Sequence, residues 1–391
     1  MIKIHLPNPL LDQRLKHKEY VITAWLWHQQ IKYRKTEVDP DWVVIHPLWG
    51  NFLQSNDKML SNLPKHILER LAQGKTGLIF WYPYETEHYA EVSVTQQIEK
   101  LLDTITVKKC LYVTGNLNTD PFYPENKLNT SIFYKSMNYD DLLVQALQDN
   151  QPRIVKVPLL FFDYQIHNHL KTNGEDDQII HENWYNWNKS KDYICLNGKA
   201  KPHRRYMIQK LLENNLADNG LLSYVCYDGV DPLQGPIYLD QNETQIRRND
   251  RYMNPGVYNN SWINIVTEAF PHVEQDMFIT EKTFKPMLQL QPFMVLGNRG
   301  TLKRLKQYGY RTFDQIWDES YDDLPTWQQR ADAIVKNLKQ WCAKSKEQKQ
   351  QDIKLVWKNI LRNQYKVCNT EFDSTRSAYL QAIVKAVSSG G

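Results

Sequence analysis

The sequence predicts an α/β fold made of two successive units, each with a parallel sheet. Short apolar runs alternate with segments of helical spacing, which is typical of parallel strands joined by crossover helices. This alternation is interrupted once, by a polar stretch at 171–191, and then resumes. A chain of 391 residues also gives two domains as the leading count, with three as the alternative. We therefore expect an N-terminal domain over 1–189 and a C-terminal domain with terminal helices over 190–391.

The first half contains four apolar runs that are predicted to be strands. Helices are predicted at 63–71, where leucine and isoleucine recur at helical spacing, and within 94–105. Pro158 lies in the fourth run and cannot donate to a strand ladder, so that run is expected to be either an edge strand or an extended approach to the sheet. The predicted strands are 42–45 (WVVI), 77–82 (GLIFWY), 109–114 (KCLYVT) and 155–162 (VKVPLLFF).

The second half repeats this pattern. Pro286 is expected to kink the helix in which it lies or to end its first part. Two such units imply a cleft between domains, and parallel sheets bind ligands at the carboxyl ends of their strands. The predicted strands are 192–196, 222–227, 262–267 and 292–296, and the predicted helices are 202–216, 280–290, 300–308 and one or two within 330–365.

Composition excludes several classes of protein. Hydrophobic residues are 41% and charged residues 24%, so the chain is not a disordered polymer. Its apolar runs are too short to span a bilayer, and nothing after Met1 resembles a signal peptide. The five cysteines show no CxxC spacing, which predicts reduced thiols, no metal site and a cytoplasmic location.

Two further bulk properties leave the partner open. A net charge of +4 is too small to indicate a polyanionic partner. The 12 Trp, 23 Tyr and 12 Phe are expected mainly in the core, although such rings also stack on bases and sugars.

The segment 196–212 (LNGKAKPHRRYMIQKLL) predicts an anion site. Its apolar residues lie on one face of a helix, and Pro202 suits the first turn. Its cations crowd the helix start, where the macrodipole is already positive, and a bound phosphate would reverse that penalty. A solvated basic turn is the alternative. The polar residues of this site are Asn197, Lys201, His203, Arg204 and Arg205.

The segment 262–297 carries a second polar cluster. Thr280 is predicted to be the N-cap of a helix whose first turn holds Glu281 and Lys282. A carboxylate at such a corner can accept hydrogen bonds from two vicinal hydroxyls, as on a ribose, and the adjacent lysine can reach a phosphate. The alternative is a capping carboxylate with a solvated lysine.

Together these segments resemble the C-terminal domain of GT-B glycosyltransferases, and in particular the α1,3-fucosyltransferases. That family has a Tyr/Phe-x-Thr-Glu-Lys motif before a helix, followed by a strand that contains proline and ends in glycine. This chain reads FITEK at 278–282 and PFMVLG at 292–297. LNGKAKPHR and the run over 302–322 also look like glycosyltransferase-like proteins of phages and large viruses. The resemblance covers about 192–323. The family's Phe-Glu-Asn-Ser stretch is absent, and NIVTE at 264–268 stands in its place.

The resemblance implies a GT-B fold and a role for each polar residue of the two segments. Glu281 would bind the ribose of a UDP- or GDP-sugar, and Lys282 and Arg204 would neutralise its diphosphate, with Lys201 and Arg205 as helpers. The resemblance also implies a hexosyl- or pentosyltransferase without a further cofactor. GT-B enzymes usually need no metal ion, and the lack of an Asp-x-Asp pair after a strand in this chain agrees with that expectation. The departure at 264–268 leaves the donor sugar and the stereochemistry open.

An inverting enzyme also needs a general base on the N-terminal domain. Glu85 is our choice, because it follows a predicted strand and is flanked by Trp81, Tyr82 and Tyr84, which would partly desolvate it. Trp184 and Trp187 are expected to line the acceptor side. The polar residues considered beside Glu85 are Glu87, His46 and Asn116.

Two acceptors and one non-catalytic alternative remain open at this point. The acceptor is a glycan or a hydroxymethylated base in viral DNA, which the enzyme would flip out of the duplex. In the viral case, the location would be the host cytoplasm. The alternative from another class is a non-catalytic α/β protein that binds nucleic acid, with the lysines over 336–358 as a minor indication.

Overall fold

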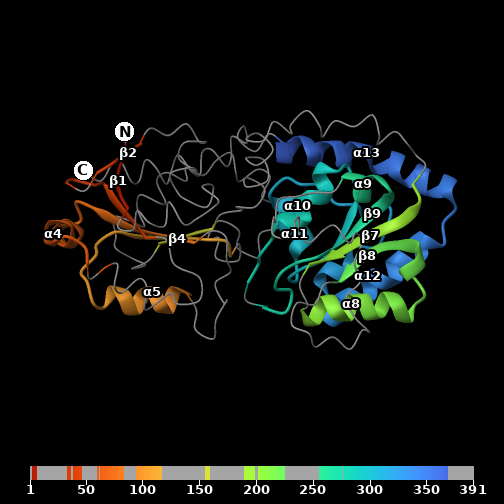
Figure 1. The fold of residues 1–391 in the computed structure, drawn as a ribbon, viewed down its shortest axis with the longest axis horizontal. Helices are drawn as coiled ribbons and strands as arrows, with labels where there is room; N and C mark the ends of the chain where they lie inside the picture. The colour runs from red at the N-terminus through yellow and green to blue at the C-terminus, as the bar shows by residue number, and fades with distance from the viewer. Residues whose placement is uncertain are drawn as a thin grey trace. The chain divides into compact units, whose positions relative to one another are not determined.

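The chain divides into two compact units, Met1–Phe161 with Glu371–Gly391, and Phe162–Thr370 (Figure 1). The predicted boundary at 189 and 190 borders 159–188, which lies outside the described residues, so it stays a prediction. In this computed structural model, the structure describes residues 2–6, 33–36, 38–45, 60, 62–82, 94–116, 155–158, 189–198, 201–224, 255–274 and 276–368.

The first unit contains a parallel sheet with the strand order β2-β1-β3-β4-β5-β6. The four predicted strands of this half are confirmed, and β6 lies at the edge, as Pro158 indicated. The sequence analysis missed the two strands at the other end, because neither forms a distinct apolar run. The strands are β1 (Ile2–His5), β2 (Tyr33–Lys35), β3 (Trp42–Ile45), β4 (Gly77–Tyr82), β5 (Cys110–Thr114) and β6 (Val155–Pro158).

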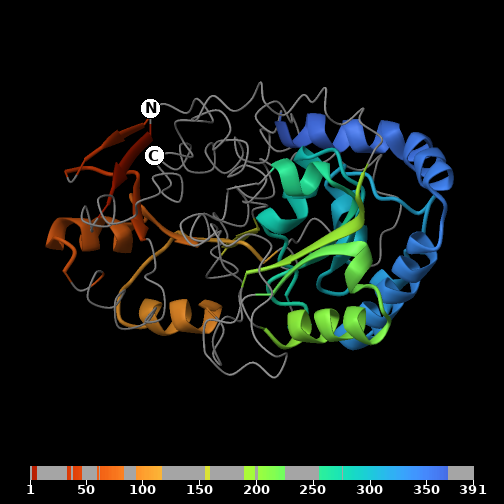
Figure 2. The same ribbon diagram turned by 45° about the vertical axis from the view of Figure 1, so that its right-hand side comes forward.

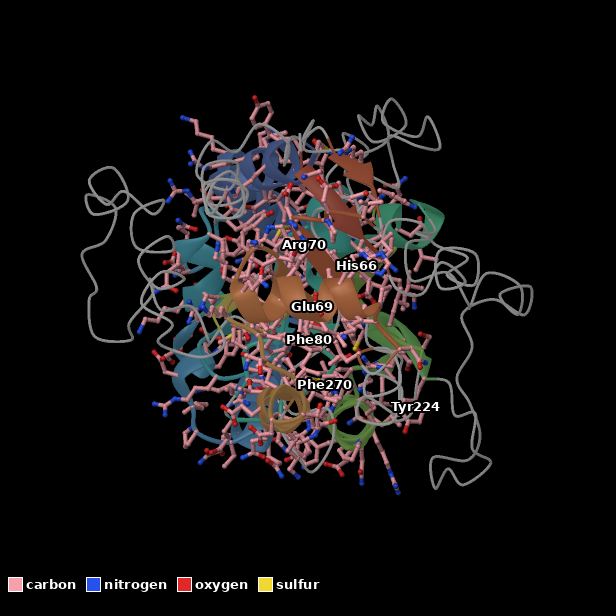
Figure 3. The ribbon with its side chains drawn as sticks, turned by 90° about the vertical axis from the view of Figure 1, so that its left-hand side faces the viewer. His66, Glu69, Arg70, Phe80, Tyr224 and Phe270 are labelled. Atoms are coloured by element: carbon pink, nitrogen blue, oxygen red, sulfur yellow. The ribbon has the colours of Figure 1, made fainter. Side chains whose placement is uncertain are left out.

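Two helices of this unit are also as predicted, α4 (Lys65–Gln73) and α5 (Val94–Leu102). The helix α4 buries Ile67 and Leu71 and carries His66, Glu69 and Arg70, which are labelled in Figure 3. Arg70 donates from Nε to the Thr76 hydroxyl, which in turn donates to the backbone oxygen of Pro40. These bonds fix the turn between α4 and β4.

The second unit contains a four-stranded parallel sheet with the order β10-β9-β7-β8. Helices α8 and α12 pack together on one side of it, and α10 and α13 pack together on the other (Figures 1 and 2). All four strands were predicted. They are β7 (Lys191–Asn197), β8 (Gly220–Tyr224), β9 (Ser261–Thr267) and β10 (Phe293–Leu296).

Five described helices of the second unit begin and end close to the predicted positions, whereas the short helix α9 (Pro255–Asn259) was not predicted. Pro286 lies inside α10, which continues for two residues beyond it, so the proline does not end the helix. Proline has no backbone N–H, so α10 lacks the hydrogen bond that residue 286 would otherwise donate to the preceding turn. The helices are α8 (Pro202–Glu213), α9 (Pro255–Asn259), α10 (Glu281–Leu288), α11 (Thr301–Gln307), α12 (Trp327–Cys342) and α13 (Lys346–Cys368).

The described strands of both sheets follow one topological rule. In each, the first strand lies between the second and the third, which is the strand order of flavodoxin-like doubly wound sheets. From its first strand, each sheet therefore extends toward the second strand on one side and toward the third on the other. This switch point lies between β1 and β3 in the first unit and between β7 and β9 in the second. Ligands of open α/β sheets bind outside the carboxyl ends of the strands at such a switch point.

Candidate functional site

The switch point of the second sheet is closed by a hydrogen bond between the last residues of two strands. Thr267, which ends β9, donates from Oγ1 to Oδ1 of Asn197, which ends β7, at 2.5 Å. Asn197 also donates from its backbone to the hydroxyl of Ser223 on β8. Asn197 is fully buried. Its side chain joins the ends of β7 and β9, where the predicted site lies.

The start of α8 is held by three successive backbone carbonyls that follow or end β9. Lys201 Nζ donates to Ala269 O at 2.8 Å, His203 Nε2 to Glu268 O at 2.8 Å, and Arg204 Nη2 to Thr267 O at 3.4 Å. The negative ends of these carbonyl dipoles offset the repulsion between the cations and the helix dipole. These contacts give a structural reason for the crowding of cations at this helix start, and the anion site stays a prediction.

His203 and Arg204 are both buried, and burial alters their proton affinity. Burial, reinforced by the charges of Arg204 and Lys201, lowers the pKa of His203 to about 3, so the imidazole is neutral. Since the carbonyl of Glu268 can only accept, Nε2 carries the proton, and Nδ1 has no hydrogen-bond partner. Burial also lowers the pKa of Arg204, against the opposing charges of Glu281 and Glu268.

The surface of this region has an aromatic component. The ammonium of Lys201 lies 3.8 Å from the centroid of the Phe270 ring, labelled in Figure 3, which is close enough for a cation–π interaction. His272 is exposed beside Phe270, and Arg205 is exposed on α8. Arg205 therefore faces solvent, whereas its neighbours His203 and Arg204 are buried.

The start of α10 is organised by a buried carboxylate that the sequence reasoning missed. Glu268 is fully buried and directly follows β9. Its Oε1 accepts from Thr280 N at 3.0 Å and from Thr283 Oγ1 at 2.6 Å, and its Oε2 accepts from Thr280 Oγ1 at 2.6 Å. Thr280 is the N-cap of α10, as predicted, and accepts from Lys282 N. A charged residue directly after an apolar strand was the signal that could have identified Glu268.

Glu281 and Lys282 form an ion pair in the first turn of α10, with Lys282 Nζ 2.5 Å from Glu281 Oε1. Lys282 Nζ also donates to Thr280 Oγ1 at 3.2 Å. Burial alone would raise the pKa of Glu281, but the charges of Lys282 and Lys285 lower it. An ammonium has three N–H groups, so these two bonds leave one for an anion. The side chain of Lys282 is 30% exposed, so an anion from solvent could reach it.

The structure thus brings the two predicted clusters to one edge of the sheet, with Glu268 contacting both. The α8 cluster comprises Asn197, Lys201, His203 and Arg204, and the α10 cluster Thr280, Glu281 and Lys282. The other predicted group is not placed: Glu85, Glu87, His46, Trp184 and Trp187 lie outside the described residues. Asn116 is described and buried, and its backbone donates to the hydroxyl of Thr114.

The described residues contain neither a cluster of metal ligands nor a helix suited to a membrane. Among them, no three His, Cys, Asp or Glu side chains are grouped as metal ligands. None of the helices that the structure describes has the length and apolar character needed to cross a bilayer.

No protein-family model and no curated protein matches the chain. Among solved structures, an α1,3-fucosyltransferase is similar with a TM-score of 0.37 and 8% identity, over 93% of this chain and 91% of that chain. α1,3-Fucosyltransferase structures with GDP-fucose and with GDP give TM-scores of 0.32 and 0.33, each at 10% identity over 92% of this chain and 90% of that one. Similarities with TM-scores below 0.5 are too weak to define a fold. The two parallel sheets themselves establish the α/β architecture.

Proposed function

We propose that the protein is a glycosyltransferase that moves a sugar from a nucleotide-diphosphate sugar to an acceptor hydroxyl without a metal ion. One observation carries this proposal: the amino ends of α8 and α10 meet at the switch point of a parallel sheet, with Arg204, Glu281 and Lys282 gathered there. A helix amino end offers backbone N–H groups and a positive dipole to an anion. Two helix amino ends together with two cations, Arg204 and Lys282, suit a diphosphate better than a single phosphate.

The proposed donor site has a ribose end and a phosphate end. Glu281 uses one oxygen to pair with Lys282, and a carboxylate has about four acceptor positions, so it can still accept from two ribose hydroxyls. Lys282 and Arg204 would neutralise the diphosphate, with Lys201 and the exposed Arg205 nearer to solvent. Asn197, His203 and Thr280 would hold these groups in place.

The proposed chemistry is stabilisation of a leaving group. When the bond between the sugar and the diphosphate breaks, negative charge develops on the diphosphate, and fixed cations stabilise that charge in the transition state. The acceptor hydroxyl bonds to the sugar and loses its proton to a general base, for which Glu85 remains our prediction. The acceptor itself, a glycan or hydroxymethylated DNA, also remains a prediction that depends on the N-terminal half.

Thermal unfolding in the presence of UDP, GDP and their sugars tests the donor site, because a ligand that binds only the folded state raises the melting temperature. Glu281→Ala should weaken the binding of the nucleotide at least about tenfold. Glu213→Ala is the matched control, since Glu213 pairs with Lys210 at the opposite end of α8. A full set of nucleotides without any effect on the melting temperature would refute the donor site. Salt-sensitive retention on DNA without nucleotide binding would favour the non-catalytic alternative.

A further inference from the structure

We propose that Glu268 is the positioning residue of the donor site, which sets the direction of the Lys282 ammonium and the place of α10 relative to α8 without touching the nucleotide. This inference rests on the proposed function. It assigns a role to a residue that neither the motif at 278–282 nor the cation cluster at 199–205 contains.

The contacts of Glu268 connect both halves of the site. Its backbone oxygen accepts from His203 Nε2 on α8. Its carboxylate accepts three hydrogen bonds from α10 and its N-cap, namely from the N–H and the O–H of Thr280 and the O–H of Thr283. A single residue at the end of β9 therefore fixes the starts of both helices.

The carboxylate also determines which way the Thr280 hydroxyl points. A hydroxyl has one proton, and Thr280 gives that proton to Glu268 Oε2. Its lone pairs consequently face the other way, where they accept from the backbone N–H and the ammonium of Lys282. The chain of donors runs from Lys282 through Thr280 to Glu268, and it places the ammonium beside Glu281.

Only an acceptor without protons completes this arrangement. Three donors share the two carboxylate oxygens of Glu268. A glutamine at this position would have an N–H₂ group in place of one oxygen, so that a donor would face a donor. If the amide faced Thr280, the hydroxyl would have to turn and give its proton elsewhere, and the position of the Lys282 ammonium would change. Since Glu268 is fully buried, water does not replace a lost acceptor without cost.

The test compares Glu268→Ala and Glu268→Gln with Gln291→Ala. Gln291 is the matched control, because it is also buried and its side-chain amide donates to Tyr258 O, Ser261 O and Ser261 Oγ at the opposite end of β9. All three variants should lose thermal stability. UDP and GDP are the probes, with binding measured by calorimetry on folded protein.

Glu268→Ala should weaken binding of the preferred nucleotide about tenfold or more, and Glu268→Gln should recover part of that loss. Gln291→Ala should bind with the parental Kd. A folded Glu268→Ala protein that binds like the parent overturns the inference, as does an equal loss in Gln291→Ala. Thr283→Val removes one of the three donors and provides a milder variant should Glu268→Ala not fold.

Amide hydrogen exchange tests the positioning role of Glu268 independently of nucleotide binding. If the parent binds neither UDP nor GDP, the proposed function fails, yet the positioning role still predicts faster exchange at Thr280 and Lys282 in Glu268→Ala. Gln291→Ala should leave exchange at these two amides as in the parent. Unchanged exchange in Glu268→Ala would overturn the positioning role by itself.

Discussion

His203 and Glu268 are joined by a hydrogen bond from the imidazole Nε2 to the backbone oxygen, at 2.8 Å, inside the protein and away from solvent. The bond needs a proton on Nε2, and burial together with the charges of Arg204 and Lys201 keeps Nδ1 unprotonated and the ring neutral. A protonated ring would place a second buried charge beside Arg204. The start of α8 therefore depends on a histidine that does not titrate in the neutral range.

This dependence predicts a loss of stability in acid. Burial lowers the pKa of His203 from 6.5 to about 3, so between these values the unfolded chain binds a proton that the folded chain does not. Stability is lost as the pH falls through that window. From pH 7 to pH 4.5 the loss due to this one residue is about 2.5 kcal/mol. Urea unfolding of the parent and of His203→Gln at both pH values measures it.

The variant removes the titration and keeps a side-chain N–H, so its unfolding free energy should fall less than that of the parent. Asp322 titrates in the opposite sense, because burial raises its pKa to about 6 and its contribution is lost as the pH rises through that value. Parent and variant share Asp322, so it cancels in the difference. Equal pH slopes for the two proteins would contradict the prediction.

Arg204→Ala should lower turnover more than it changes nucleotide affinity. In the proposed function the guanidinium would stabilise charge that develops only as the diphosphate leaves, and groups of that kind are worth about 10²–10³ in kcat. The measurement is sugar transfer, or hydrolysis of the donor, at saturating donor concentration. Arg362→Ala, on the exposed face of α13, is the control, and comparable rates for the two variants would count against the role of Arg204.

Threonine is the N-cap of two described helices of the second unit, α10 and α12, and substitutions at these caps separate effects on stability from effects on binding. Thr280→Ala removes the cap of α10, and Thr326→Ala removes the capping box of α12. Each should cost about 1 kcal/mol of unfolding free energy. Only Thr280→Ala should weaken UDP or GDP binding, since Thr280 also orients Lys282. Chemical denaturation and calorimetry decide the matter, and a loss of binding in both variants would show that capping alone is responsible.

Two glycines test whether the units unfold separately. A Cβ at Gly77 would overlap the ring of Trp42 in the first sheet, and a Cβ at Gly220 would overlap the ring of Tyr193 in the second. Overpacking of this kind costs about 1–3 kcal/mol. Scanning calorimetry should show two transitions, of which Gly77→Ala lowers one and Gly220→Ala the other. A single transition lowered by both substitutions would indicate one cooperative unit.

Sequence reasoning located the strands of the second unit because each is a short apolar run, and β9 is buried along its whole length. It also located Thr280, since an N-cap leaves a local signature. It could not locate the role of Glu268 or the carbonyl contacts of α8. Those contacts join residues between 63 and 68 positions apart in the chain. They exist only because β7 and β9 are neighbours in the sheet, whereas β8 lies between them in sequence.

The strand order shared by the two sheets has a consequence for the search for a general base. In the first unit the crossover connections diverge between β1 and β3, so chain order alone favours the residues that leave these two strands. His46 is the first residue after β3, whereas Glu85 follows β4, one strand further from the divergence. A mutational scan for the proton acceptor should therefore include His46 beside Glu85, which remains our prediction.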